Sequence, residues 1–305
     1  MNALGKQYLL AIDFGGTKVA IRLMNHNGDI LDSEKQIITG MDGIEILKLV
    51  FKISDKLCQS HKEDIAAIGV STIGIVAGDH LELVPTIKNW DKINLRAEFA
   101  NFFSNTPLYI ENDVKAATYG ELINGALQNS KSGIYLNLGT GVAVGLTLNN
   151  QVIKGSHGAA GEIGYLLNPF TRNNDAFSNG HAPFEELTGG KGIAEQIAKI
   201  SKTSMDAKTF WETQFDPNTP LADLKQKIFL NLGYQISNLC IAWDPEIITI
   251  GGGMEAQFDL FAKELNPILK TNVPFPPVLK PAYYKQNASL NGISQLILNK
   301  IAVAE

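Results

Sequence analysis

Hydrophobic and polar residues alternate near the start of the chain in a way that predicts two strands joined by a tight turn. An apolar run over residues 8–12 predicts a buried strand, and apolar residues then recur at every second position through Val19, Ile21 and Leu23. The turn between them reads Asp13-Phe14-Gly15-Gly16-Thr17-Lys18. Glycines at such a turn allow tight folding and bring backbone N–H groups close to a ligand.

The side chains of this turn suit phosphate chemistry. Asp13 places a carboxylate at the end of a strand, where it can hold a metal-bound water, and Thr17 and Lys18 add a hydroxyl and a cation for phosphate oxygens. Most Gly-Gly turns are plain hairpins, however, and a solvated strand residue is the slightly favoured alternative for Lys18. The turn alone therefore leaves a phosphate site and a simple hairpin as alternatives.

The same pattern returns over residues 134–146. It has a strand, the turn Gly139-Thr140-Gly141 and a second strand, with Asn137 where Asp13 stood. A repeat at this separation indicates a duplicated domain and not a short-period solenoid. We therefore predict an α/β fold of two lobes, each with a phosphate-type hairpin, and a cleft between the lobes in which a nucleotide can lie.

Periodicity assigns most of the remaining chain. Strands are predicted at 65–76, 107–110 and 246–250, and helices at 44–61, 95–103, 114–127, 193–200, 221–242 and 291–302. Residues 201–220 predict a helix pair with an irregular connection, and the proline-rich stretch 274–281 predicts an exposed loop. The N-terminal lobe is expected to comprise 1–113 plus 290–305, and the C-terminal lobe 114–289.

Polar or glycine residues follow three of the predicted strands, where open α/β proteins place their chemistry. Gly74 ends the first strand, Asn112 and Asp113 follow the second, and residues 251–253, all glycine, follow the third. The triple glycine lets backbone approach a flat ring or a phosphate. Alternatives remain open: Gly74 can form an ordinary turn, and Asn112 or Asp113 can simply cap the following helix.

Composition narrows the class of protein. Of the 305 residues 45% are hydrophobic, enough for substantial cores, and the net charge of −5 without a Lys/Arg-rich block argues against nucleic-acid binding. Cys58 and Cys240 are the only cysteines, which excludes a disulfide framework or a cysteine-built zinc site and suits a reducing compartment. Without a signal-peptide pattern or a run of about 20 apolar residues, we expect no membrane contact and a cytoplasmic location.

Six motifs, in order along nearly the whole chain, resemble the ROK family (repressors, open reading frames, sugar kinases) of the actin/hexokinase/Hsp70 superfamily. They are Asp13-Phe14-Gly15-Gly16-Thr17, Ser71-Thr72-Ile73-Gly74-Ile75-Val76, Glu111-Asn112-Asp113, Leu138-Gly139-Thr140-Gly141, Gly161-Glu162-Ile163-Gly164 and Ile250-Gly251-Gly252-Gly253. The resemblance implies an actin-like, RNase H-like fold and an ATP-dependent sugar kinase.

The resemblance also implies roles for individual residues. Asp113 would be the general base on the attacking sugar hydroxyl, and Asn112, Glu162 and Glu185 would bind sugar hydroxyls. The wider substrate-binding set adds Gly74, Asn89 and Tyr165, with a structural turn beside Trp90 as the alternative for Asn89. The ATP phosphates with Mg²⁺ would be held by Asp13, Gly15, Gly16, Thr17, Lys18, Gly139, Thr140 and Gly141. The adenosine would lie against Gly251, Gly252 and Gly253.

Two departures from the family pattern affect substrate and metal. A histidine that usually follows Gly-Glu-Ile-Gly is Tyr165 here, and residues 166–184 contain no cysteine where the family has a zinc cluster. His181 alone does not make a tetrahedral zinc site, so we predict no structural zinc. The loop over 168–183 would then be held by packing or substrate, or be partly mobile. Tyr165 can replace one hydrogen bond to the sugar or simply pack.

The expected function is phosphorylation of a hexose at O6, with glucose as the default substrate. N-acetylmannosamine, other amino sugars and β-glucosides stay open, and the family resemblance implies a homodimer. A sugar-responsive regulator is one alternative, but only twelve residues precede Asp13, so we expect no helix-turn-helix module. The other is a catalytically silent sugar-binding homologue, against which the presence of Asp113 and both glycine hairpins argues.

Overall fold

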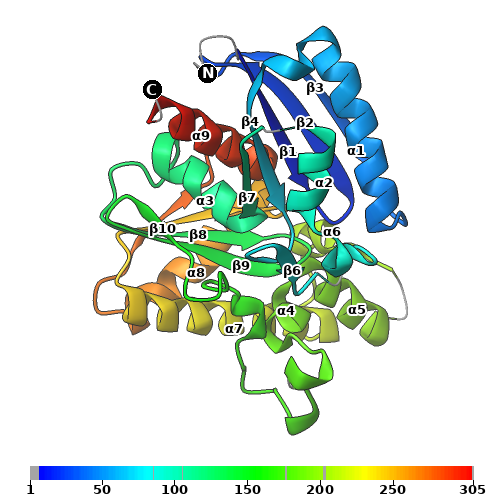
Figure 1. Cartoon of the computed structure of the whole chain (residues 1–305). Coiled ribbons are helices and arrows are strands. Elements are labelled where there is room, and N and C mark those ends of the chain that lie inside the picture. Colours follow the sequence, from blue (N-terminus) through cyan, green and yellow to red (C-terminus); the bar gives the residue numbers. More distant parts are fainter. Residues whose placement is uncertain (1–6, 85, 105, 176, 202–203, 304–305) are drawn as a thin grey trace. The chain divides into compact units, whose positions relative to one another are not determined.

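The computed structural model describes residues 7–84, 86–104, 106–175, 177–201 and 204–303. The chain has an α/β fold that divides into two compact units (Figure 1). Unit 1 contains the described parts of 1–123, 154–160 and 287–305, and unit 2 contains those of 124–153 and 161–286. The predicted boundary after residue 113 lies one helix before this division, and the short segment 154–160 belongs to unit 1.

The sheet of unit 1 has the strand order β3-β2-β1-β4-β7. Its strands are β1 (Tyr8–Phe14), β2 (Lys18–Asn25), β3 (Ile30–Ile37), β4 (Ile65–Thr72) and β7 (Leu108–Asn112). Strands β1 and β3 each run antiparallel to β2, whereas β4 runs parallel to both β1 and β7. A separate two-stranded sheet joins β5 (Ile75–Ala77) to β6 (His80–Glu82).

The sheet of unit 2 repeats this plan with the order β10-β9-β8-β11-β12. It consists of β8 (Ser132–Leu138), β9 (Val142–Leu148), β10 (Gln151–Ile153), β11 (Ile247–Gly251) and β12 (Val278–Pro281). The register agrees as well: Asp13 pairs with Ser71 across β1 and β4, and Asn137 pairs with Gly251 across β8 and β11. The predicted duplication is therefore confirmed.

Two edge strands depart from the sequence-based expectation. Residues 274–281 were predicted to be a loop, but Val278–Pro281 form β12, which pairs in parallel with β11. Proline is tolerated there because an edge strand needs hydrogen bonds on one side only. The strand β3 was not predicted, since its mostly exposed residues do not show the alternation of a half-buried strand.

The helices of unit 1 are α1 (Gly43–Cys58), α2 (Leu95–Phe102), α3 (Asp113–Asn124) and α9 (Ala288–Ala302). Two of them, α1 and α9, cover opposite faces of the sheet (Figure 1). Alternate β1 residues point to opposite faces. Leu10 and Ile12 share a core with α1, whereas Leu9 and Ala11 share one with α9. Asp13, the next residue in the second series, therefore faces the α9 side.

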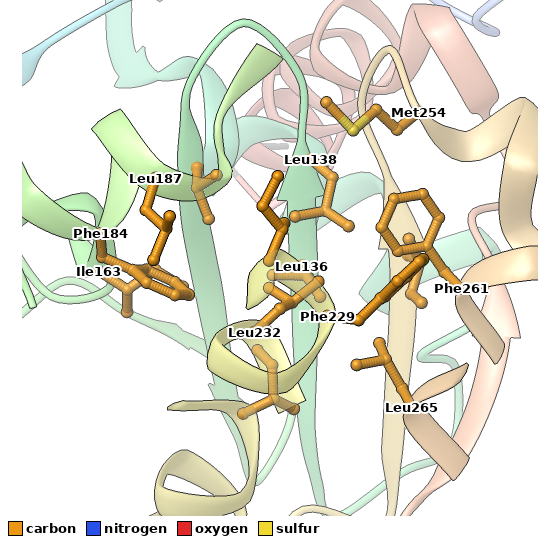
Figure 2. Packing of buried hydrophobic residues seen from close by; sticks show 14 of the residues in the cluster. Leu136, Leu138, Ile163, Phe184, Leu187, Phe229, Leu232, Met254, Phe261 and Leu265 are labelled. Carbon is orange, nitrogen blue, oxygen red and sulfur yellow. The ribbon is translucent and has the colours of Figure 1, made fainter. Parts of the chain in front are cut away.

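The core of unit 2 is built from α4 (Pro183–Thr188), α5 (Gly190–Ser201), α6 (Ala207–Glu212), α7 (Pro220–Trp243) and α8 (Phe258–Asn272). Figure 2 shows Phe184 and Leu187 of α4 gathered with Ile163, and Phe229 of α7 beside Phe261 of α8. The last two rings meet edge to face with centroids 5.5 Å apart. This packing fixes the helices that surround the second glycine hairpin.

Short 3₁₀ turns complete the elements: η1 (Gln59–Asp64), η2 (Trp90–Lys92), η3 (Ile163–Tyr165), η4 (Asn173–Asp175), η5 (Phe177–Asn179), η6 (Glu255–Gln257) and η7 (Lys285–Asn287). A search of the helices in the described part of the chain finds none that is both long and apolar enough to cross a bilayer.

Candidate functional site

Asp13 lies at the carboxyl end of β1 and meets the first turn of α9. The Ser289 hydroxyl donates to Asp13 Oδ1 over 2.6 Å, and the Ser71 and Ser289 hydroxyls are hydrogen-bonded to each other. Ser71 reaches this position because it pairs with Asp13 across β1 and β4. Residues of β1, β4 and α9 thus form a hydrogen-bonded group around the Asp13 carboxylate. Ser289 was not among the residues predicted from the motifs.

The charges around Asp13 are consistent with a site for a metal-bound phosphate. Burial raises the pKa of the Asp13 carboxyl, and hydrogen bonds from the Ser289 and Ser71 hydroxyls and the charges of Lys18 and Lys35 partly offset this. The pKa of Lys18 is lowered by burial and then by its neighbour Lys35, which the sequence analysis had missed. The strand register explains why Lys35 lies near Asp13, because Ala20 of β2 pairs with Asp13 on one side and with Lys35 on the other.

These donors fit Mg²⁺ that arrives with a nucleotide. Magnesium prefers oxygen ligands and is bound by one or two carboxylates together with substrate phosphates and water. Asp13 supplies one such carboxylate, and the described residues contain no group of three or more His, Cys, Asp or Glu side chains that could form a metal cage. A magnesium ion at Asp13 would therefore take most of its ligands from phosphate and water.

The first glycine turn has the compact geometry that its sequence predicts. The Gly15 N–H donates to the Lys18 carbonyl over 3.0 Å, and the Thr17 carbonyl accepts from the Ile38 N–H over 3.0 Å. A Cβ atom added at Gly16 would lie 3.3 Å from Thr86 Oγ1. The turn is therefore fixed by backbone hydrogen bonds, and Thr17 is exposed at its tip.

At the end of β7, Asn112 both caps a helix and holds Asp113. Its Oδ1 accepts from the Lys115 N–H over 3.0 Å, and its Nδ2 donates to Asp113 Oδ1 over 3.1 Å. The Val114 N–H donates to the same carboxylate oxygen over 2.9 Å. The capping and catalytic interpretations of this motif are thus compatible, because the cap orients the carboxylate. Asn112 itself is buried.

Gly74 enters the site through its backbone. Its carbonyl accepts from Asn112 Nδ2 over 2.9 Å, and its φ of +86° lies in the left-handed region, where a side chain would also collide with Val84. Asn89 also lies in the left-handed region, with φ +60°, and its Oδ1 accepts from Lys92 Nζ over 3.1 Å. Asn89 thus forms the structural turn that the sequence left as an alternative.

In unit 2 three glycine segments come together. The Gly139 N–H donates to the Gly141 carbonyl over 3.0 Å and closes the tip of the second hairpin. The first turn of α5 bonds to this hairpin, because the Gly190 N–H donates to the Gly139 carbonyl over 2.9 Å and the Lys191 N–H donates to the Thr140 carbonyl over 3.1 Å. Gly190 was not among the predicted site residues.

The third segment, residues 251–253, lies against the same hairpin. The Met254 N–H donates to the Leu138 carbonyl over 2.9 Å, and a Cβ atom added at Gly253 would lie 3.9 Å from Gly139 Cα. Gly252 has φ +83°, and a side chain there would strike the Leu138 carbonyl. Backbone with few side chains therefore forms this surface, which suits close approach of a ring or a phosphate.

Glu162, Tyr165 and Glu185 gather in unit 2. Glu185 Oε2 accepts from the Val142 N–H over 2.9 Å, and burial raises the pKa of the Glu185 carboxyl. The pKa of Tyr165 is raised by burial and then by the charges of Glu162 and Glu185. The structure therefore brings together three of the predicted sugar-binding side chains.

The described part of the loop over 168–183 makes packing contacts and hydrogen bonds. Tyr165 meets Phe177 edge to face, with ring centroids 5.2 Å apart. Asn168 Nδ2 donates to the Pro183 carbonyl over 3.0 Å, and Lys227 Nζ lies 3.8 Å from the centroid of the Phe170 ring. These contacts support packing as one of the explanations that the sequence left open for this loop.

Comparison with known proteins identifies the family. The model of the ROK family matches residues 9–300. The chain belongs to the ROK family. As a ROK protein it has the two-lobed actin-like fold, and the matching registers of its two sheets agree with the duplication in that fold.

Both kinases and repressors occur among the relatives of this ROK protein. A β-glucoside kinase from Listeria monocytogenes is 26% identical over 93% of this chain and 95% of its own, and a xylose repressor from Caldicellulosiruptor bescii is 25% identical over 86% of this chain and 69% of its own. The fold is similar to a ROK family glucokinase from Streptomyces griseus in complex with glucose and AMPPNP, with TM-score 0.75 and 22% identity over 95% and 98% of the two chains.

Proposed function

We propose that this ROK protein is an ATP-dependent sugar kinase that transfers the γ-phosphoryl group to O6 of a hexose. The observation that carries the proposal is the Asp113 carboxylate, oriented by Asn112 and the first turn of α3 at the end of a parallel strand. Relatives that are a β-glucoside kinase and a glucokinase support it. A protein that only bound a sugar would have no need of an oriented base.

The roles in unit 1 follow from the chemistry. Phosphoryl transfer depends on positioning, neutralisation of phosphate charge and a base near the nucleophile. Asp113 would orient the sugar hydroxyl and accept its proton, while Asn112 and Gly74 position Asp113. Lys18 and the turn N–H groups would hold the phosphates, and Asp13 would hold a Mg²⁺ ion that neutralises their charge.

The roles in unit 2 follow from its glycine surface and its carboxylates. The segments 139–141 and 251–253, with the start of α5, would bind the nucleotide through backbone N–H groups. Glu162 and Glu185 would accept hydrogen bonds from sugar hydroxyls. Tyr165 lies beside them and would help to decide which hexose is accepted among glucose, N-acetylmannosamine and β-glucosides.

The test measures ADP release with ATP and Mg²⁺ over glucose, mannose, fructose, N-acetylglucosamine, N-acetylmannosamine and a β-glucoside. We expect turnover on at least one sugar, lost by a factor of about 10³ or more in Asp113→Asn, since the variant keeps the shape but not the base. The exposed Asp91→Asn is the matched control and should keep full activity. Turnover that survives in Asp113→Asn would overturn the assignment of the base.

A second outcome would favour a different function. If no sugar is turned over but calorimetry still detects sugar binding, the protein is a sugar-responsive binder, as the similarity to a repressor allows. The homodimer expected from the family stays a prediction, which light scattering on the purified protein can check.

A further inference from the structure

Glu111 is a buried carboxylate that the proposed reaction does not use. It precedes Asn112 in the strand-end motif, and only 6% of its surface is exposed. Its Oε1 accepts from the Asn112 N–H over 3.1 Å, and its Oε2 forms an ion pair with the Lys154 ammonium. A buried carboxylate needs such partners, since an unpaired charge in the interior is strongly unfavourable.

Lys154 reaches Glu111 from an unusual part of the chain. It begins the segment 154–160, which belongs to unit 1 although the chain on both sides belongs to unit 2. The segment closes on itself, because the Ala160 N–H donates to the Lys154 carbonyl over 3.0 Å. It also packs against β5, since a Cβ atom added at Gly158 would lie 3.1 Å from the Val76 carbonyl.

We propose that the Glu111–Lys154 ion pair is a positioning pair for the base Asp113, an inference that rests on the proposed kinase function. Hydrogen bonds connect the residues in sequence: Lys154 holds the Glu111 carboxylate, Glu111 holds the Asn112 N–H, and the Asn112 side chain holds Asp113 Oδ1. Lys154 thereby acts on the base without touching the substrate.

The same pair anchors the chain that leads to a sugar-binding residue. Glu162 follows the segment 154–160 by two positions, so the ion pair holds the chain that precedes Glu162. The pair thus ties the chain before Glu162 to the strand end that carries Asp113. We expect its loss to affect the sugar more than the nucleotide.

The experiment is a double-mutant cycle with Lys154→Met and Glu111→Gln. We expect each single variant to lower kcat about 10- to 100-fold, as small misplacements of a reacting group do, with an unchanged KM for ATP. The double variant should lose no more than either single variant, because both remove the same interaction. Lys154→Arg should restore most of the activity, and the exposed Lys48→Met should match the wild type.

Hydrogen–deuterium exchange gives a readout that does not depend on activity. We expect Lys154→Met to raise exchange in peptides covering 110–116 and 154–162 and to leave the rest of the protein unchanged. If the wild type phosphorylates no sugar, the kinase proposal fails while exchange still reports on the pair. Additive losses, a wild-type kcat in Lys154→Met, or uniform exchange would each overturn the positioning role.

Discussion

The Ser289 hydroxyl donates to the Asp13 carboxylate over 2.6 Å, although 276 positions separate the two residues in the chain. Asp13 faces α9 because it continues the series of β1 residues that includes Leu9 and Ala11. Ser289 is the second residue of that helix, so the last helix of the chain helps to fix a carboxylate of the first strand.

Replacing Ser289 by alanine should therefore weaken nucleotide binding. A hydrogen bond to a charged group contributes about 1.5 to 3 kcal/mol, so we expect the affinity for ATP with Mg²⁺ to fall about 10-fold or more in Ser289→Ala. Calorimetric titration with AMPPNP and Mg²⁺ measures this. Ser294→Ala is the matched control, because that hydroxyl donates to the Leu290 carbonyl, accepts a 3.4 Å bond from Arg22 and does not bond to Asp13. Equal losses in both variants would contradict a specific role for Ser289.

The Tyr165 hydroxyl is predicted to contribute to sugar binding. Tyr165→Phe keeps the ring contact with Phe177 but removes the hydroxyl that lies near two carboxylates. We expect KM for the sugar to rise about 2- to 10-fold, as loss of one hydrogen bond implies, with an unchanged KM for ATP. Steady-state kinetics on the preferred sugar measures both values, and an unchanged sugar KM would assign Tyr165 a packing role.

Glu185 should make stability depend on pH. Burial raises its pKa in the folded protein above the ordinary value of 4.5, so the folded state binds this proton more tightly than the unfolded state does. The stabilisation from the protonated form is fully present below about pH 4.5 and is lost as pH rises through the raised pKa.

Glu185→Gln removes this titration while keeping an oxygen acceptor for the Val142 N–H. We expect the variant to have a higher Tm than the wild type at pH 7, a difference that shrinks as pH falls towards 4.5, and weaker sugar binding. Thermal melts over a pH series measure it. A Tm difference that is constant with pH would exclude Glu185 as the titrating group.

Both cysteines should be inert in the folded protein. Burial raises the pKa of Cys58 to about 11 and that of Cys240 to about 12, so almost no thiolate exists at neutral pH. We expect a thiol reagent to label neither residue natively and both after denaturation. Mass spectrometry after a timed reaction counts the labels, and fast native labelling would indicate local opening around the labelled helix.

The sequence revealed those features of the site that depend on neighbouring residues. Local patterns of glycine, hydrophobic alternation and capping mark three features: the turn after Asp13, its copy after Asn137 and the strand end at Asp113. These features could therefore be predicted from the sequence. Ser289, Lys35 and Lys154 were not predicted, because docking of a distant helix, pairing of strands and the return of the segment 154–160 to unit 1 bring them to their partners. The edge strand β12 was missed because the prolines before it and its own Pro281 indicate a loop, and proline is acceptable in a strand only where one side is unpaired.

The position of α9 has a consequence for protein synthesis. The ribosome makes β1 well before α9, and chains fold from the N-terminus as they emerge. Leu290, Ile293 and Ile297 of α9 cover the face of β1 that carries Leu9 and Ala11. This face therefore stays exposed while the whole of unit 2 is translated. A nascent chain released before residue 288 would therefore keep an exposed apolar sheet face. We expect chaperones to bind such truncated products or proteases to degrade them.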